Sequence, residues 1–150
     1  MKMKYEAEIN ACREFVWATF DNPDNLSRWQ PTLESFTHQA GKPGQPGAVS
    51  ELVYNENGKK LTTTETVTER RKPDFMAGYY DNAWATTLIV NHFEAVDDNT
   101  TRFISYANIN FKGIMKIMSL FTARSIRNRV EADINRFKLL VETEAAGAQL

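Results

Sequence analysis

Glu65 is the side chain in this sequence that is best placed to do chemistry. Asn57-Gly58 stands between two alternating segments, and this dipeptide favours a type I′ hairpin turn, which needs two positive φ angles. A two-residue turn there pairs Tyr54 with Leu61, Leu52 with Thr63, and Ser50 with Glu65, and cross-strand partners share a face of the sheet. The apolar members mark that face as the inner one. Glu65 then points into an apolar interior, where burial raises the pKa of a carboxyl group.

Two interpretations of Glu65 follow from this placement. In the first, the carboxyl group is a general acid, a general base or an anchor for a ligand. In the second, it pairs with an inward Arg or Lys, or it faces solvent because the strand register is shifted by one residue. We rank the second above the first, so Glu65 is a catalytic candidate and not an assignment.

A second hairpin supplies the other polar groups of the predicted interior. If Asp97-Asp98-Asn99 is a three-residue loop with Asn99 left-handed, Phe93 pairs with Phe103. The same register joins Asn91 to Ser105, Ile89 to Ala107, and Thr87 to Ile109. The predicted ligand-binding residues are therefore Leu52, Tyr54, Thr63, Thr87, Ile89, Asn91, Phe93, Phe103, Ser105 and Ile109, together with Met118 and Phe121 at the mouth. Such a lining suits an apolar ligand that is oriented by few hydrogen bonds.

Other reactive residue types give weaker signals. His38 and His92 stand in no metal-binding spacing, and His92 falls on the outer face, so no metal site is predicted. Cys12 precedes a helix, where a thiol can be activated, but no partner histidine is identifiable and packing is the simpler explanation. The glycine-rich loop 41–47 lacks a phosphate-binding pattern. No cofactor is predicted.

The tryptophans and the opening of the last helix have several possible roles. Trp17 and Trp29 are expected to pack the short helices on the sheet, whereas Trp84 suits the cavity rim and ordinary packing about equally. The apolar residues that open the last helix could gate the cavity mouth. Alternatively, they begin an ordinary amphipathic helix. Together with neighbouring basic residues they could also touch an anionic membrane surface, which we rank third.

The elements that must position these side chains are readable from periodicity. Alternation predicts seven strands, at 3–9, 33–40, 48–56, 59–71, 75–81, 84–96 and 101–112. A helix at 11–20 follows a cap at Asn10, and a brief second helix starts at Pro23 after a cap at Asn22 or Asp21 and ends near Trp29. Apolar residues at three- and four-residue steps predict a long helix over about 114–143. These residues are Ile117, Leu120, Phe121, Ile126, Val130, Ile134, Phe137, and Leu140 or Val141.

Composition fits one globular α+β domain. The chain has 150 residues, of which 25% are charged and 42% hydrophobic, and the ordered core is expected over about 3–143 with a frayed tail after it. A formal net charge of −1 argues against general nucleic-acid binding. One cysteine allows no disulfide within the chain and fits a cytoplasmic location. No signal segment or membrane span is predicted. Oligomeric state is left open.

The chain resembles the START-like helix-grip superfamily, and within it the polyketide cyclase/dehydrase-like (SRPBCC) proteins. The resemblance covers about 3–143 and is carried by segments 9–17, 21–26, 29–31, 65–73 and 98–102 and by the closing helix. It implies a curved seven-stranded antiparallel sheet wrapped around a long C-terminal helix, with two short helices between the first and second strands. It also implies a deep cavity for lipids, polyketides or other apolar molecules.

Three functions therefore stay open. The first is a carrier or sensor that binds a small, largely apolar ligand between the sheet and the last helix. The second is a cyclase, dehydratase or hydrolase that uses the same cavity. The third is a module that modulates a partner protein through an outer face. Fold analogy alone does not choose among them.

Overall fold

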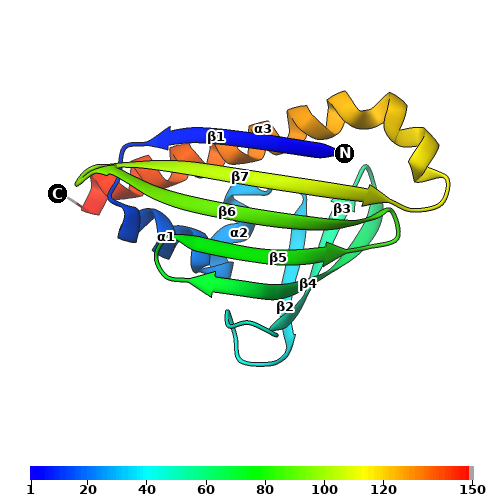
Figure 1. Cartoon of the computed structure of the whole chain (residues 1–150), viewed down its shortest axis with the longest axis horizontal. Coiled ribbons are helices and arrows are strands. Elements are labelled where there is room, and N and C mark those ends of the chain that lie inside the picture. The colour runs from blue at the N-terminus through cyan, green and yellow to red at the C-terminus, as the bar shows by residue number, and fades with distance from the viewer. Residues whose placement is uncertain (149–150) are drawn as a thin grey trace.

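The chain forms one curved antiparallel sheet with its helices gathered on one face (Figure 1). The computed structural model describes residues 1–148. The strands are β1 (Lys2–Ile9), β2 (Leu33–Ala40), β3 (Val49–Glu56), β4 (Lys59–Arg71), β5 (Phe75–Asp81), β6 (Ala85–Asp97) and β7 (Thr100–Phe111). The helices are α1 (Arg13–Asp21), the 3₁₀ turn η1 (Pro23–Asn25), α2 (Leu26–Trp29) and α3 (Met115–Ala148). The fold is therefore the helix-grip arrangement expected from the sequence.

The sheet order is β1-β7-β6-β5-β4-β3-β2, so consecutive strands from β2 to β7 are neighbours and β1 closes on β7. The predicted turn at Asn57-Gly58 is confirmed, because both residues have positive φ, 53° and 87°. The predicted pairs Tyr54–Leu61, Leu52–Thr63 and Ser50–Glu65 are also confirmed. This register turns the inner face of β3 and β4 toward α3.

The β6–β7 hairpin reaches the predicted register by a different local route. Phe93 does pair with Phe103, and Asn91 with Ser105. The predicted loop is wrong, however, because Asp97 pairs with Thr100 and the register shifts between Ala95 and Asp97. Asn99 is not left-handed, since Asn57 is the non-glycine residue with positive φ in the described chain. A bulge in β6 thus replaces the extra loop residue.

The helix caps were predicted in part. Asn22 accepts a hydrogen bond from the Asp24 backbone N–H (3.0 Å), and Pro23 occupies the first position of η1, as expected. The cap at Asn10 is wrong, because α1 begins after Cys12, whose side chain makes no capping bond. Asn10 instead donates its backbone N–H to Glu142 Oε2 (2.8 Å) on α3. The start of α1 is thus held by tertiary contact.

The last helix begins where it was predicted to begin but runs past its predicted end. It continues to Ala148, so residues 144–148 are helical where a frayed tail was expected, and residues 149–150 lie outside the described part. Its first turns extend past the end of β1 and off the sheet (Figure 1). Ile117, Leu120 and Phe121, which were counted in the helical period of this segment, are all exposed. No helix in residues 1–148 is long and apolar enough to cross a membrane.

A cluster of contacting aromatic rings forms a large part of the core. Phe137 of α3 is fully buried, and its ring lies 5.2 Å from Trp29, 5.5 Å from Phe103 and 5.7 Å from Phe20. Phe93 contacts the rings of Trp17, Phe20 and Phe103 in turn. These contacts join the two short helices, α3 and the central strands at one end of the sheet. The interior beyond them is hollow.

Candidate ligand-binding cavity

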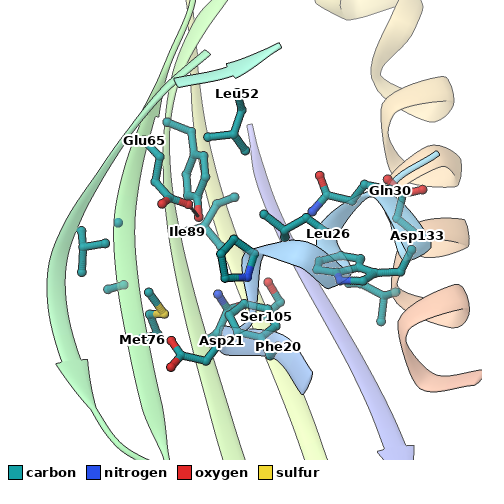
Figure 2. A pocket seen from close by; sticks show the side chains of 18 of the residues that line it. Phe20, Asp21, Leu26, Gln30, Leu52, Glu65, Met76, Ile89, Ser105 and Asp133 are labelled. Atoms are coloured by element: carbon teal, nitrogen blue, oxygen red, sulfur yellow. Dashed lines mark hydrogen bonds between the residues drawn. The ribbon is translucent and has the colours of Figure 1, made fainter. Parts of the chain in front are cut away.

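A cavity of about 320 Å³ lies between the inner face of the sheet and the α2–α3 side (Figure 2). Its walls are predominantly apolar. The apolar lining side chains include Phe20, Leu26, Trp29, Leu52, Val67, Met76, Ile89, Phe103, Ile126, Val130 and Ile134. The volume and the apolar walls match those of small-molecule sites.

The strongest polar feature of the cavity is a hydrogen bond between two cross-strand partners. Tyr80 Oη donates to Glu65 Oε2 over 2.7 Å, and the register pairs these residues directly across β4 and β5. Figure 2 shows the Glu65 carboxylate in the cavity on the sheet side. Burial raises the pKa of Glu65 above its ordinary value, and the bond from Tyr80 partly opposes that shift. The pKa of the Tyr80 hydroxyl is raised as well, by burial and by the nearby carboxylate.

Three small polar side chains line the same wall. Asn91 and Ser105 are buried cross-strand partners on β6 and β7, and Ser50 is the buried partner of Glu65 on β3. All three contribute to the cavity surface. Amide and hydroxyl groups both donate and accept hydrogen bonds, so this wall can bind a carbonyl, a hydroxyl or a carboxylate of a ligand.

The opposite wall carries a charged group from α3. Asp133 lines the cavity and accepts a hydrogen bond from Arg136 (2.7 Å). Burial raises the pKa of Asp133, against the lowering influence of Arg129 and Arg136. Arg129 also reaches the cavity, but its guanidinium group is engaged by Glu56 and by Thr32 Oγ1 (3.0 Å). These bonds tie α3 to the end of β3 and to the residue that precedes β2.

A further ion pair lies at the α1 end of the cavity. Arg70 Nη2 bonds to Asp21 Oδ2 at 2.7 Å, and both side chains are largely buried. The Arg70 guanidinium also stacks over Trp17, 5.3 Å from the ring centroid. The inward Arg considered in the second interpretation of Glu65 therefore exists, but its charge is paired with Asp21 instead.

Six of the residues predicted to line the interior do line it: Leu52, Glu65, Ile89, Asn91, Phe103 and Ser105. The others lie elsewhere. Tyr54 is not part of the cavity wall; its hydroxyl donates a hydrogen bond to Gln30 Oε1 (2.8 Å). Thr63 is also outside the wall, and its hydroxyl accepts a hydrogen bond from Asn82 Nδ2 (3.2 Å). Thr87 is half-buried beside Tyr80 on the neighbouring strand.

The remaining predicted residues fall in the core or on the surface. Phe93 packs in the aromatic core, and Ile109 packs with Met3 and Ala85 in a second cluster. Met118 and Phe121 are exposed on the part of α3 that leaves the sheet, so they do not line the cavity. The helix itself was predicted correctly, but Phe121 points away from the face that Phe137 buries, and these first turns extend beyond the sheet.

Several cavity residues were not predicted, with Tyr80 the most important. Its signal was present in the alternation of β5, but β4 and β5 shift register between Val67 and Glu69. Counting outward from the 72–74 turn without that bulge pairs Glu65 with Asp81 and hides the contact with Tyr80. Trp29, Gln30 and Asp133 were missed because their approach to the sheet depends on how α2 and α3 dock.

The weaker candidates lie apart from the cavity. His92 is on the outer face between Phe75 and Tyr106, as predicted, and His38 Nε2 bonds to the Gly41 carbonyl (2.8 Å). Cys12 is a half-buried free thiol. Trp84 is partly exposed in the β5–β6 turn. None of these four residues is part of the cavity wall.

Known structures share this architecture over almost the whole chain. TTHA0849 from Thermus thermophilus superposes with a TM-score of 0.80 at 15% identity, covering 97% of this chain and 99% of that one. The Zhui aromatase/cyclase from Streptomyces sp. R1128 superposes with a TM-score of 0.78 at 12% identity, covering 95% of this chain and 93% of that one. Ara h 8.0201 superposes with a TM-score of 0.72 at 12% identity, covering 95% of this chain and 98% of that one. At these identities the likeness establishes the fold alone.

The fold and the apolar cavity define a START-like, helix-grip domain of the SRPBCC type. The family model described as polyketide cyclase / dehydrase and lipid transport matches residues 1–142, and the chain belongs to that family. Comparison with curated proteins gave no sequence match.

Proposed function

We propose that this protein binds a small, largely apolar ligand in the cavity between the sheet and α3, as a carrier or sensor of that ligand. The observation that carries the proposal is the cavity itself, about 320 Å³ with mostly apolar walls. Transfer of an apolar molecule from water to such walls is favourable, at roughly 25 cal/mol per Å² of buried apolar surface. The family description, which includes lipid transport, agrees with this role.

Ligand orientation is assigned to the polar wall. Glu65, Asn91 and Ser105 present their polar groups to the cavity from three strands of one sheet face. A ligand with one oxygen-bearing end would direct that end to this wall and its apolar body toward Leu26, Trp29 and α3. The sheet positions these groups before binding, which reduces the entropy lost on association.

A pair of neighbouring residues on β6 gives a matched test. Ile89 lines the cavity, whereas Leu88 occupies the opposite face beside Tyr79. Ile89→Phe should fill part of the cavity and weaken binding of the dye anilinonaphthalene sulfonate by about tenfold or more. Leu88→Phe adds similar bulk outside and should bind the dye normally. Equal dye binding by both variants would refute the cavity as the site.

Native mass spectrometry of protein purified from cells supplies an independent readout. Wild-type protein should carry a small-molecule adduct that Ile89→Phe lacks and Leu88→Phe retains. Thermal unfolding of each variant shows whether the fold is intact, because loss of the adduct through unfolding would not support the proposal.

A second candidate is acid–base catalysis in the same cavity, and the Glu65–Tyr80 pair favours it. A carboxylate with a raised pKa is a better base than an exposed one at neutral pH. Glu65 would remove a proton from a carbon next to a ligand carbonyl and return it to a departing hydroxyl as water leaves. The aromatase/cyclase among the similar structures makes a linear polyketide thioester a reasonable substrate to try.

Glu65→Gln separates the two candidates. Glutamine keeps the size of the side chain and an acceptor for Tyr80, but it cannot take a proton. In an enzyme, the variant should lose turnover by 100-fold or so while ligand binding changes little. If wild-type protein does not convert a polyketide thioester faster than buffer does, the enzymatic candidate fails and the binding proposal stands.

A further inference from the structure

The first turns of α3 present an apolar surface that the fold leaves uncovered. Ile114, Ile117, Leu120 and Phe121 are each between 63% and 79% exposed, and Met118 is 43% exposed. Exposed apolar residues are ordinary one at a time, but a contiguous group of this size on one element marks a contact site.

This surface is separate from the stripe that packs α3 on the sheet. Phe121 and Phe137 are 16 positions apart, which at about 100° per residue places them on roughly opposite sides of the helix. Phe137 is fully buried, whereas Phe121 is the most exposed of these side chains. The apolar group therefore points away from the core, and packing inside the domain does not account for it.

The segment that carries this surface has positively charged residues and no negatively charged ones. Residues 112–130 contain five basic residues and no acidic residue, in a chain whose formal net charge is −1. Lys112 is paired with Asp81, and Arg129 with Glu56, while Lys116 and Arg124 are exposed beside the apolar group. The surface thus combines apolar side chains with positive charge.

A partly exposed tryptophan lies at the same end of the molecule. The Lys112 backbone N–H donates to the Trp84 carbonyl (2.8 Å), which fixes the β5–β6 turn beside the entry to α3. Figure 1 shows this turn and the overhanging turns of α3 at the same end of the sheet. Tryptophan is favoured where apolar and polar phases meet, because its ring is apolar and its N–H is a donor.

We propose that residues 114–121, at the start of α3, together with Trp84 and Arg124, form a docking surface for an anionic lipid bilayer. The apolar side chains would enter the boundary between headgroups and acyl chains, and the two cations would contact lipid phosphates. A bilayer fits this surface better than a second copy of the chain does. Symmetric pairing through the segment would bring two clusters of the same charge together.

The surface adjoins the cavity, but the docking proposal does not rest on the cavity being occupied. Ile126 and Arg129, which follow Phe121 by five and eight residues along α3, already belong to the cavity wall. Docking would therefore place one end of the cavity close to the bilayer. Vesicle binding can be measured with the protein alone, so its failure would leave the ligand-binding proposal untouched.

Vesicle co-sedimentation tests the proposal directly. Wild-type protein should bind vesicles of phosphatidylcholine with one third phosphatidylglycerol at least about tenfold more tightly than vesicles of phosphatidylcholine alone, and salt should reduce the difference. Leu120→Ser combined with Phe121→Ser should lower binding to the anionic vesicles by about tenfold or more. Lys116→Glu combined with Arg124→Glu should abolish the preference for anionic lipid.

Two control variants match these changes. Leu139→Ser removes an apolar side chain that is 66% exposed farther along the same helix, and Lys72→Glu reverses an exposed charge in the β4–β5 turn. Both should bind vesicles as wild type does. All substituted residues are exposed, so circular dichroism should show that each variant folds.

Two results would overturn the proposal. One is absence of vesicle binding by wild-type protein, or equal binding by the Leu120/Phe121 double variant. The other is a concentration-dependent dimer in light scattering that the same double variant converts to monomer, which would assign the surface to self-association.

Discussion

Tyr80 and Glu65 are joined inside the cavity by a 2.7 Å hydrogen bond, and they are direct cross-strand partners on β5 and β4. The bond gives the buried carboxylate one fixed donor and leaves the rest of its acceptor capacity facing the cavity. It couples the protonation of Glu65 to the sheet register, because a one-residue slip would turn either side chain to the outer face.

Replacing Glu65 with Gln should change how stability depends on pH. Burial raises the pKa of Glu65 in the folded chain above the ordinary value of 4.5. At a pH between 4.5 and the folded-state pKa, Glu65 is therefore protonated in the folded chain and ionised in the unfolded chain. The stability from this group is complete below pH 4.5 and is lost as pH rises through the folded pKa. The stability of Glu65→Gln relative to wild type should therefore increase with pH over this interval.

Urea unfolding at a series of pH values measures that difference. Glu69→Gln, an exposed change on the same strand, is the control and should track wild type. A constant difference between Glu65→Gln and wild type across the series would show that the Glu65 pKa is the same in the folded and unfolded chains.

Removing the Tyr80 hydroxyl should destabilise the fold and raise the pKa of Glu65 further. Tyr80→Phe leaves the ring in place but removes the donor to a buried carboxylate, at a cost of about 1–2 kcal/mol. Titration of Glu65 by carboxyl-carbon NMR should show the higher pKa, since the lost bond was the influence that lowered it. Tyr79→Phe, on the exposed face of the same strand, should change neither quantity.

Truncating Phe137 should be among the most damaging single changes in α3. Its fully buried ring contacts Phe20, Trp29 and Phe103, and Phe137→Ala should cost about 3–5 kcal/mol in the free energy of unfolding. Leu139→Ala, two residues away and exposed, should cost less than about 0.5 kcal/mol. Comparable losses for the two variants in denaturant titration would mean that α3 does not dock as described.

The turn should require glycine at position 58 because of the positive φ angle there, and not because a side chain would clash with its neighbours. The φ of Gly58 is 87°, and nothing lies within 4 Å of the position that a Cβ would occupy. Gly58→Ala should therefore destabilise the hairpin by about 1 kcal/mol through backbone strain alone. Gly147→Ala has equally open surroundings but a helical backbone, and should be neutral or mildly stabilising. The two variants are compared by their thermal midpoints.

The register of two hairpins illustrates how far local rules reach. Asn57-Gly58 determines its turn by local chemistry, so the β3–β4 pairs were predictable and Glu65 was correctly placed inside. The β6–β7 pairs were predicted correctly for a wrong local reason, because a bulge between Ala95 and Asp97 offsets a turn one residue shorter than expected. In the β4–β5 hairpin no second change offsets the bulge, so the pairing of Tyr80 with Glu65 was not predicted.

Gly78 shows which sequence signal was overlooked at that bulge. A Cβ on Gly78 would lie 2.9 Å from the Thr66 carbonyl oxygen, so the close approach of β4 and β5 there excludes any side chain. A glycine inside an alternating strand is a signal for a bulge or a close backbone approach. Gly78 thus marks where the bulge lies, opposite Val67, but the extra residue belongs to β4, so the glycine alone does not give the direction of the register shift.

The sequence by itself determined the strands, the long helix, the inward face of β3 and β4, and the family, because alternation, turn residues and helical period are local properties of the chain. Only the tertiary structure decided which apolar residues are covered. Phe121 and Phe137 belong to one predicted helix, yet they point to roughly opposite sides of it: Phe121 lies on the turns beyond the end of the sheet, and Phe137 lies over the aromatic core. Burial depends on whether another element lies opposite, and that is a property of the assembled fold.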